Sequence, residues 1–271
     1  MNNPISKAAT PWSALTKHRA LTLEMAKRDV LGRYRGATFG LVWSLASPIA
    51  MLAVYTLAFG EIMKSRWPGS STTADFSLII FVGIIAHGFL SECMIRAPTL
   101  IVSNSNYVKK IVFPLEILPW QMTLSALFHA AMNFVVFALF FLTLHKGLHW
   151  TIVLLPIVFL PLVVMAVGIG WLLSALAVYV RDIQQVVTPL STAMLFLSSA
   201  IVPVELVPEK FRVLFQLNPL TLIIDQARTV ALWGQSPDFA ALGMYSVAAI
   251  VVALLGFACF SATKEGFADV L

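Results

Sequence analysis

Residues Trp150–Tyr179 read WTIVLLPIVFLPLVVMAVGIGWLLSALAVY and contain no Asp, Glu, Lys or Arg. The hydrocarbon core of a bilayer is about 30 Å thick, and a helix needs about 20 apolar residues to cross it. This run therefore predicts a transmembrane helix that is long enough to tilt. Pro156 and Pro161 are the positions at which a kink is expected.

Apolar runs of similar length recur along the chain. The other predicted spans are about Phe39–Met63, Phe76–Ile95, Ile117–Leu144, Val186–Val202 and Phe239–Ser261. The chain is 59% hydrophobic and 11% charged, against roughly 45–50% and 25% for a soluble domain. The sequence therefore predicts an all-α integral membrane protein with six transmembrane helices. A cytoplasmic segment, residues 1–38, would precede a transmembrane domain, residues 39–271.

The segment before the first predicted span carries an apolar stripe at helical spacing, interrupted by Arg19. The members of the stripe are Trp12, Leu15, Leu23, Ala26 and Val30. An amphipathic helix of this kind is predicted to lie in the membrane interface with its apolar side toward the lipid. The alternative is an ordinary cytoplasmic helix that packs on its own protein.

The stretch Val213–Trp233 is apolar enough to resemble a further span, but Asn218-Pro219 breaks it and Asp225 and Arg228 are charged. Broken backbone at membrane depth is tolerated only where protein or a water-filled cavity covers it. We therefore expect an outer re-entrant helical hairpin, about residues 204–233, between the fifth and sixth spans, with its turn near Pro219.

The basic residues indicate the orientation. With both termini in the cytoplasm, twelve Lys and Arg side chains lie inside and six outside, in agreement with the positive-inside rule. The inside set is Lys7, Lys17, Arg19, Lys27, Arg28, Arg33, Arg35, Arg96, Lys109, Lys110, Arg181 and Lys264. The outside set is Lys64, Arg66, Lys146, Lys210, Arg212 and Arg228. Because these residues adjoin apolar runs, they indicate an anionic membrane surface, and no nucleic acid partner is expected.

Motifs for chemistry are missing from the sequence. It contains no GxxxxGK[ST] phosphate-binding loop, no HExxH or GxSxG motif and no Cys/His spacing for a metal. We therefore expect no catalytic or metal-binding residue and no cofactor in this chain. His87 and His129 are the ionisable groups predicted at membrane depth, where such groups are functional candidates. The alternative for each is a neutral imidazole hydrogen-bonded between helices.

Four strings, in the same order, resemble permeases of polysaccharide ABC exporters, the ABC-2 type proteins that export O-antigen, capsule or teichoic acid chains. They are Arg33-Tyr34-Arg35-Gly36 leading into Leu41-Val42-Trp43-Ser44 and Pro48, Asn104 to Pro119, Val180-Arg181-Asp182-Ile183, and Asn218-Pro219-Leu220-Thr221 with Asp225 and Arg228. The resemblance extends from about residue 28 to the C-terminus. Its first-span region is more similar to O-antigen exporters than to the capsule branch.

The resemblance implies a homodimer in the bacterial inner membrane that pairs with two copies of a cytoplasmic ABC ATPase subunit. ATP and Mg would bind to that subunit, and the substrate would be a lipid-linked polysaccharide, with O-antigen as the leading candidate. The residues implied in coupling to the ATPase are Asn104, Tyr107, Val108, Lys109, Lys110, Arg181 and Asp182. The short basic loop around Tyr107 and Val108 also has the character of a segment that docks into a partner's groove.

A passage for a sugar polymer usually offers aromatic faces and hydroxyl-bonding groups. The candidate residues for such a glycan path are Tyr34, Trp43, Tyr55, Met194, Phe196 and Ser199. For each of them, helix packing or anchoring at the membrane interface is the alternative.

Other functions stay open on the sequence alone. One is an ABC-2 permease for a small drug or lipid. Another is a proton-coupled secondary transporter in which His87 or His129 relays protons. A third is a membrane-embedded enzyme, although the site residues of the common classes are missing.

Overall fold

The computed structural model describes residues 10–62, 73–109, 113–145 and 147–271, and within these ranges the regular structure is helical. Five helices are long and apolar enough to cross a membrane: Gly40–Ala58, Ala74–Leu100, Ile117–His145, Trp150–Tyr179 and Phe239–Val270. They coincide with five of the six predicted spans. The prediction of an all-helical membrane protein is therefore confirmed.

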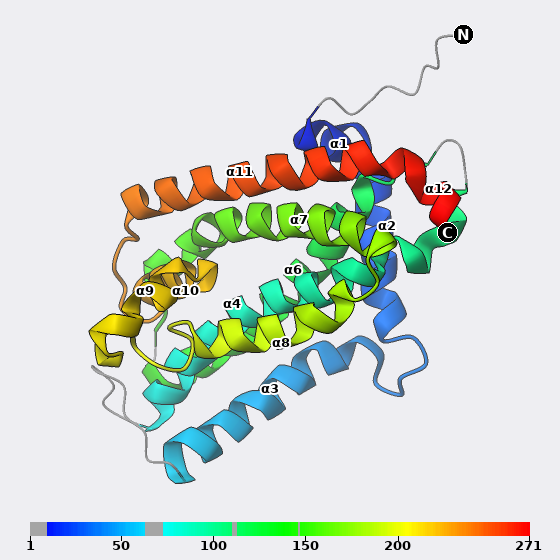
Figure 1. The fold of residues 1–271 in the computed structure, drawn as a ribbon. Helices are drawn as coiled ribbons and strands as arrows, with labels where there is room; N and C mark the ends of the chain where they lie inside the picture. The colour runs from blue at the N-terminus through cyan, green and yellow to red at the C-terminus, as the bar shows by residue number, and fades with distance from the viewer. Residues whose placement is uncertain (1–9, 63–72, 110–112, 146) are drawn as a thin grey trace.

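The long helices lie side by side as one bundle (Figure 1). They comprise α3 (Trp43–Tyr55), α4 (Thr73–Leu100), α6 (Ile117–His145), α7 (Leu155–Tyr179) and α11 (Phe239–Thr263), with the shorter α8 (Ile183–Phe196) among them. α4 is the central helix, because it packs against α6, α7, α8 and α10 (Pro219–Ala231). Its residues Ile80, Val82 and Ala86 are fully buried.

α7 and α11 form the closest helix pair. A Cβ added to Gly256 would lie 2.1 Å from the carbonyl oxygen of Gly168, and one added to Gly168 would lie 2.7 Å from Cα of Ala253. Lipid tails are as apolar as Leu, so helices associate in a bilayer through close van der Waals packing rather than through apolar burial. These small residues therefore allow the two backbones to touch.

The N-terminal segment differs from the single amphipathic helix that was predicted. The chain breaks at His18 into α1 (Pro11–Lys17) and α2 (Arg19–Arg33), and α2 lies across the end of the bundle (Figure 1). Ala26 and Val30 are buried and α2 packs on α6, whereas Leu23 is 58% exposed. On α2, two of the three residues of the stripe thus face the protein itself. This favours the alternative in which the helix packs on its own protein.

The turn from α2 to α3 depends on two glycines with positive φ, Gly36 at 87° and Gly40 at 49°. Residues with a side chain rarely adopt this left-handed backbone conformation, but glycine does so without steric cost. The turn reverses the chain so that α3 runs back along the bundle (Figure 1).

The predicted fifth span, Val186–Val202, is shorter in the structure. α8 has 14 residues, which is about 21 Å of helix at 1.5 Å per residue, less than the roughly 30 Å of a hydrocarbon core. The chain leaves the helix after Phe196 and continues through a short turn, Val204–Leu206, into α9 (Glu209–Leu217) and α10. α9 and α10 lie at one end of the bundle, opposite to α2 and to the C-terminal α12 (Phe267–Val270) (Figure 1).

Candidate functional site in the pocket between α2 and the α4–α5 turn

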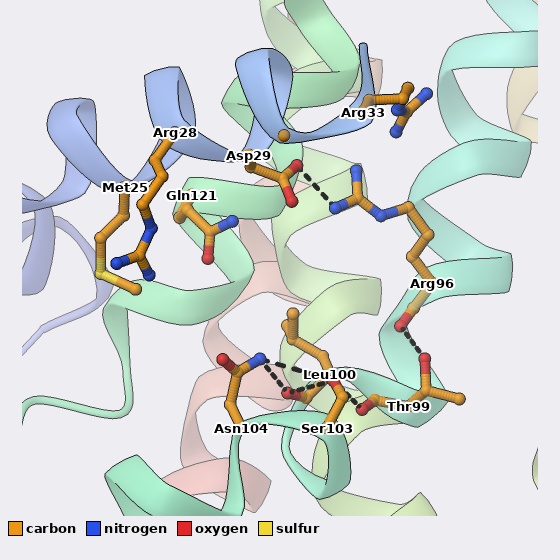
Figure 2. Close-up of a pocket in the computed structure, with 11 residues that line it drawn as sticks. Met25, Arg28, Asp29, Arg33, Arg96, Thr99, Leu100, Ser103, Asn104 and Gln121 are labelled. Carbon is orange, nitrogen blue, oxygen red and sulfur yellow. Dashed lines mark hydrogen bonds and ion pairs between the residues drawn. The ribbon is translucent and has the colours of Figure 1, made fainter. Parts of the chain in front are cut away.

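A pocket of about 590 Å³ lies where α2 meets the end of α4, the turn that follows and the start of α6 (Figure 2). The turn consists of a 3-10 segment, Val102–Asn104, and α5, Ser105–Val108. The polar side chains that line the pocket include Arg28, Asp29, Arg33, Arg96, Asn104 and Gln121. The three arginines are the feature that sets its chemistry.

A network of ion pairs joins α2 to α4 beside the pocket. Glu92 accepts hydrogen bonds from Arg33 and, at 3.0 Å, from Arg96, and Arg96 also donates to Asp29 at 2.6 Å. These side chains are 20–39% exposed, so each single pair contributes little to stability. Because the pairs share partners, they hold the two helices in one relative position.

Arg28 links α2 to the predicted coupling segment. Its guanidinium donates to the hydroxyl of Tyr107 at 2.8 Å, and this hydrogen bond raises the pKa of Arg28 above its ordinary value. The Tyr107 ring stacks on Phe113, with ring centroids 4.4 Å apart. Tyr107 is therefore held between α2 and the start of the next span.

The other residues implied in coupling lie at the same end of the bundle. The Asn104 carboxamide donates to the carbonyl of Leu100 at 2.8 Å and so closes the end of α4. Val108 is half-buried and Lys109 exposed, whereas Lys110 lies outside the described residues. Arg181 and Asp182 are exposed in the α7–α8 turn, at the end that α2 crosses (Figure 1). Within the described ranges, the hydrogen bonds of Asn104 stay inside its own turn and do not reach these two residues.

At the opposite end, polar side chains of the α9–α10 region satisfy the backbone where α8 stops. The Asn218 carboxamide donates to the carbonyls of Met194 at 2.8 Å and Leu197 at 2.9 Å. Helix ends leave backbone carbonyls without partners, and at membrane depth no bulk water is available to satisfy them. Asn218 therefore allows the helix to end here.

Arg228 completes this arrangement from α10. It is fully buried, and it donates to the carbonyls of Ile79 at 3.0 Å, Ser199 at 2.7 Å and Ala200 at 3.0 Å. The carboxylate of Asp225 lies 3.6 Å from it. One guanidinium thus holds the backbone beyond α8 against α4.

The six candidates for a glycan path have different surroundings. Trp43 and Phe196 are exposed, and Tyr34, Tyr55 and Met194 are half-buried. Tyr34 lies near His129, with ring centroids 6.0 Å apart. Ser199 is buried, and its hydroxyl donates to the carbonyl of Thr221 at 3.3 Å. In this conformation, Ser199 is therefore part of the packing between α8 and α10.

His87 joins two helices, whereas the ring nitrogens of His129 have no hydrogen-bond partner in the described part of the chain. The His87 ring nitrogen Nε2 lies 3.0 Å from the Ser191 carbonyl, which connects α4 to α8. His129 Nδ1 lies 3.6 Å from a carboxylate oxygen of Glu92. Glu92 pairs with Arg96 on the same helix, four residues away, a spacing at which opposite charges on a helix lie side by side. The pairs with Arg33 and Asp29 could not be predicted from such a spacing, because 59 and 67 residues separate the paired side chains.

Comparison with known proteins decides the family. The profile described as ABC-2 type transporter matches residues 20–232. The chain belongs to the ABC-2 type transporter family. It is accordingly a membrane subunit of a transporter. The matched part of this ABC-2 chain begins in α2 and ends just beyond α10, so it contains both the pocket and the backbone contacts of Arg228.

The ABC-2 chain is also similar to curated relatives along most of its length. It is 22% identical over 257 residues to the O-antigen export system permease protein RfbA of Myxococcus xanthus, covering 94% of this chain and 96% of that protein. A Klebsiella pneumoniae protein with the same name is 22% identical over 253 residues, covering 93% and 95%. The polysialic acid transport protein KpsM of Escherichia coli is 20% identical over 241 residues, covering 88% and 91%.

Proposed function

We propose that this chain is the membrane-spanning permease of an ATP-driven exporter that moves a lipid-linked polysaccharide, with O-antigen as the leading candidate. The observation that carries the proposal is the similarity to permeases named for O-antigen export, which covers 93–94% of this chain. The similarity to a polysialic acid transport protein points to the same substrate class. The apolar helical bundle supplies the membrane part that such an exporter needs.

The proposed topology has six crossings and both termini in the cytoplasm of a bacterium, with the chain in its inner membrane. α8 together with the chain that directly follows it would make the fifth crossing, and α9–α10 would be the re-entrant hairpin on the outer side. Support comes from the arrangement of the bundle, in which α2 and α12 share one end and α9–α10 lie at the other (Figure 1). The excess of Lys and Arg on the α2 side agrees with this orientation.

The proposed assembly contains two copies of this chain and two copies of an ABC ATPase subunit, which would bind ATP and Mg. A single bundle is filled by its own side chains, such as Trp171 and Phe137, both fully buried. A conduit wide enough for a sugar chain would therefore form between two copies. Trp43 and Tyr55 on α3, Met194 and Phe196 on α8, and Tyr34 at the end of α2 remain the proposed glycan contacts. Ser199 would take part only if the turn after α8 moves.

The α4–α5 turn is the proposed coupling segment. Replacing both Lys109 and Lys110 by Glu is expected to lower copurification of the ATPase subunit about tenfold or more, because the substitutions reverse two charges of the proposed coupling segment, in which Lys109 is exposed. Insertion into the membrane should be unchanged. Quantitative pull-down of the ATPase with the tagged permease measures the effect, and unchanged copurification would contradict the coupling assignment.

Depletion of the chain from its host tests the proposed function itself. Lipid-linked glycan should accumulate on the cytoplasmic side while surface polysaccharide falls, and expression of the chain should restore both. A phage or lectin probe of the cell surface and extraction of lipid-linked glycan would measure the two pools. Normal surface polysaccharide, with a changed efflux of a small drug or lipid instead, would contradict the proposal and favour the other class of ABC-2 permease.

A further inference from the structure

The side chain of Gln121 indicates that the pocket beneath α2 binds a ligand. Gln121 is only 7% exposed, and it lines the pocket at the start of α6. Among the described residues, none forms a hydrogen bond with its carboxamide. Its carboxamide opens onto the pocket, so a group bound there would find a hydrogen-bond partner in it.

Arg28 adds a positive charge to the same pocket. The other charged groups around it balance, since Arg33 and Arg96 pair with Asp29 and Glu92. For Arg28, by contrast, no carboxylate lies within ion-pair distance in the described part of the chain, and it donates a hydrogen bond to the Tyr107 hydroxyl. Figure 2 shows Arg28 and Gln121 on the same side of the pocket, across from Asn104 and Ser103. The pocket therefore offers a guanidinium and an amide to an anion.

The walls of the pocket favour a protein carboxylate over a lipid phosphate. Met25 and Leu100 are the large apolar side chains in its described lining, which is otherwise mostly polar and suits a carboxylate better than an acyl chain. One wall is formed by Ser103 and Asn104, which begin the proposed coupling segment. A partner that grips that segment would bring its own side chains to the pocket.

We propose that an Asp or Glu side chain of the ATPase subunit enters this pocket and is bound by Arg28 and Gln121. The inference rests on the proposed function, because it names the chemistry by which the ATPase recognises the permease. It adds α2 and α6 to the docking surface. The acidic residue would fix the position of α2 relative to the α4–α5 turn in the assembled exporter.

Binding of the tagged ATPase subunit to the permease in nanodiscs tests the proposal. Arg28→Glu is expected to weaken the affinity about tenfold or more, since it opposes two carboxylates. The matched control is Lys27→Glu, which changes the neighbouring exposed residue of α2 outside the pocket lining and should leave the affinity unchanged. A charge-reversing substitution of one acidic residue on the ATPase surface should restore binding to the Arg28→Glu permease.

Gln121→Leu separates a binding role from a structural one. It removes an amide that pairs with none of the described residues, so the thermal midpoint should stay the same or rise, while the affinity for the ATPase should fall by roughly threefold to tenfold. Unchanged affinity in both pocket variants, with weakened binding in the Lys109→Glu, Lys110→Glu permease, would overturn the pocket but keep the coupling segment.

The remaining outcomes are also decisive. If the wild-type chain binds no ATPase subunit, the proposed function fails and this inference fails with it.

Native mass spectrometry of the permease with phosphatidylglycerol measures whether the pocket binds a lipid instead. Loss of bound lipid from the Arg28→Glu and Gln121→Leu variants, at unchanged affinity for the ATPase, would show a lipid site and overturn the proposal.

Discussion

Replacement of Arg228 by methionine is expected to destabilise the protein by about 3 kcal/mol or more, because buried carbonyls that lose their donor cost roughly 1–3 kcal/mol each. The carbonyls are those of Ile79, Ser199 and Ala200. Methionine fills a similar space but donates no hydrogen bond. The backbone after α8 should therefore separate from α4.

The loss of a buried charge acts in the opposite direction. A buried arginine is costly to desolvate, and apolar replacements of buried ion pairs are sometimes stabilising. Here the guanidinium donates to three backbone carbonyls, and a backbone carbonyl cannot be removed by the substitution. We therefore expect the unpaired carbonyls to decide the result, and the Arg228→Met substitution to destabilise.

Arg228→Lys provides the graded comparison. Lysine keeps the charge but presents a single ammonium group, which cannot reproduce the planar set of donors on Nε, Nη1 and Nη2. Its thermal midpoint in detergent should lie between those of the wild type and the Arg228→Met variant. Arg19→Met, at an exposed position of α2, is the control and should have no measurable effect. An Arg228→Met protein with the thermal midpoint of the wild type would refute the role given to Arg228.

A single methyl group at Gly256 is expected to destabilise the α7–α11 pair by about 3 kcal/mol, at the upper end of the range for overpacked sites. The added Cβ would lie 2.1 Å from the carbonyl oxygen of Gly168, which is backbone and cannot rotate away. The two helices would have to move apart along their shared surface. Because α11 leads into the C-terminal α12, α12 would be displaced as well.

Gly243→Ala on the same helix is the matched control. A Cβ at Gly243 would meet nothing within 4 Å, and alanine is a better helix former than glycine by about 1 kcal/mol. This variant should therefore be as stable as the wild type or more so. Thermal unfolding in one detergent, with the monodisperse fraction as a second measure, compares the two. Equal stability of the Gly256→Ala and Gly243→Ala proteins would show that α7 and α11 are not in the close contact described.

The limits of the five long helices could be predicted because the signal is local. An uncharged run such as Trp150–Tyr179 must be covered by lipid or protein wherever it lies in the fold. The length of α8 could not be predicted in the same way. Its early end depends on Asn218 and Arg228, which lie 21 to 29 residues from the carbonyls that they bind at the end of α8 and just beyond it. Arg228 also binds the carbonyl of Ile79, 149 residues away. The sequence pattern identified both residues as unusual without indicating their partners.

The pocket beneath α2 could not be predicted from sequence patterns, for a related reason. Arg28 and Tyr107 are 79 residues apart, and Arg96 and Asp29 are 67 apart. Periodicity predicted a stripe on the N-terminal helix, but it could not show the break at His18 or which face would be covered by α6. Gln121 was not predicted as a site residue, since one polar residue near the start of an apolar helix is common. Its meaning depends on its burial and on the missing hydrogen bond.

Transport in proteoliposomes tests the central claim most directly. The permease and its ATPase subunit would be reconstituted with a labelled lipid-linked glycan, and glycan that reaches the far side would be measured with a membrane-impermeant lectin. The account predicts transport that requires both subunits and ATP with Mg, and that continues when an ionophore removes the proton gradient. Transport by the permease alone, or transport that stops with the ionophore while ATP hydrolysis continues, would contradict it.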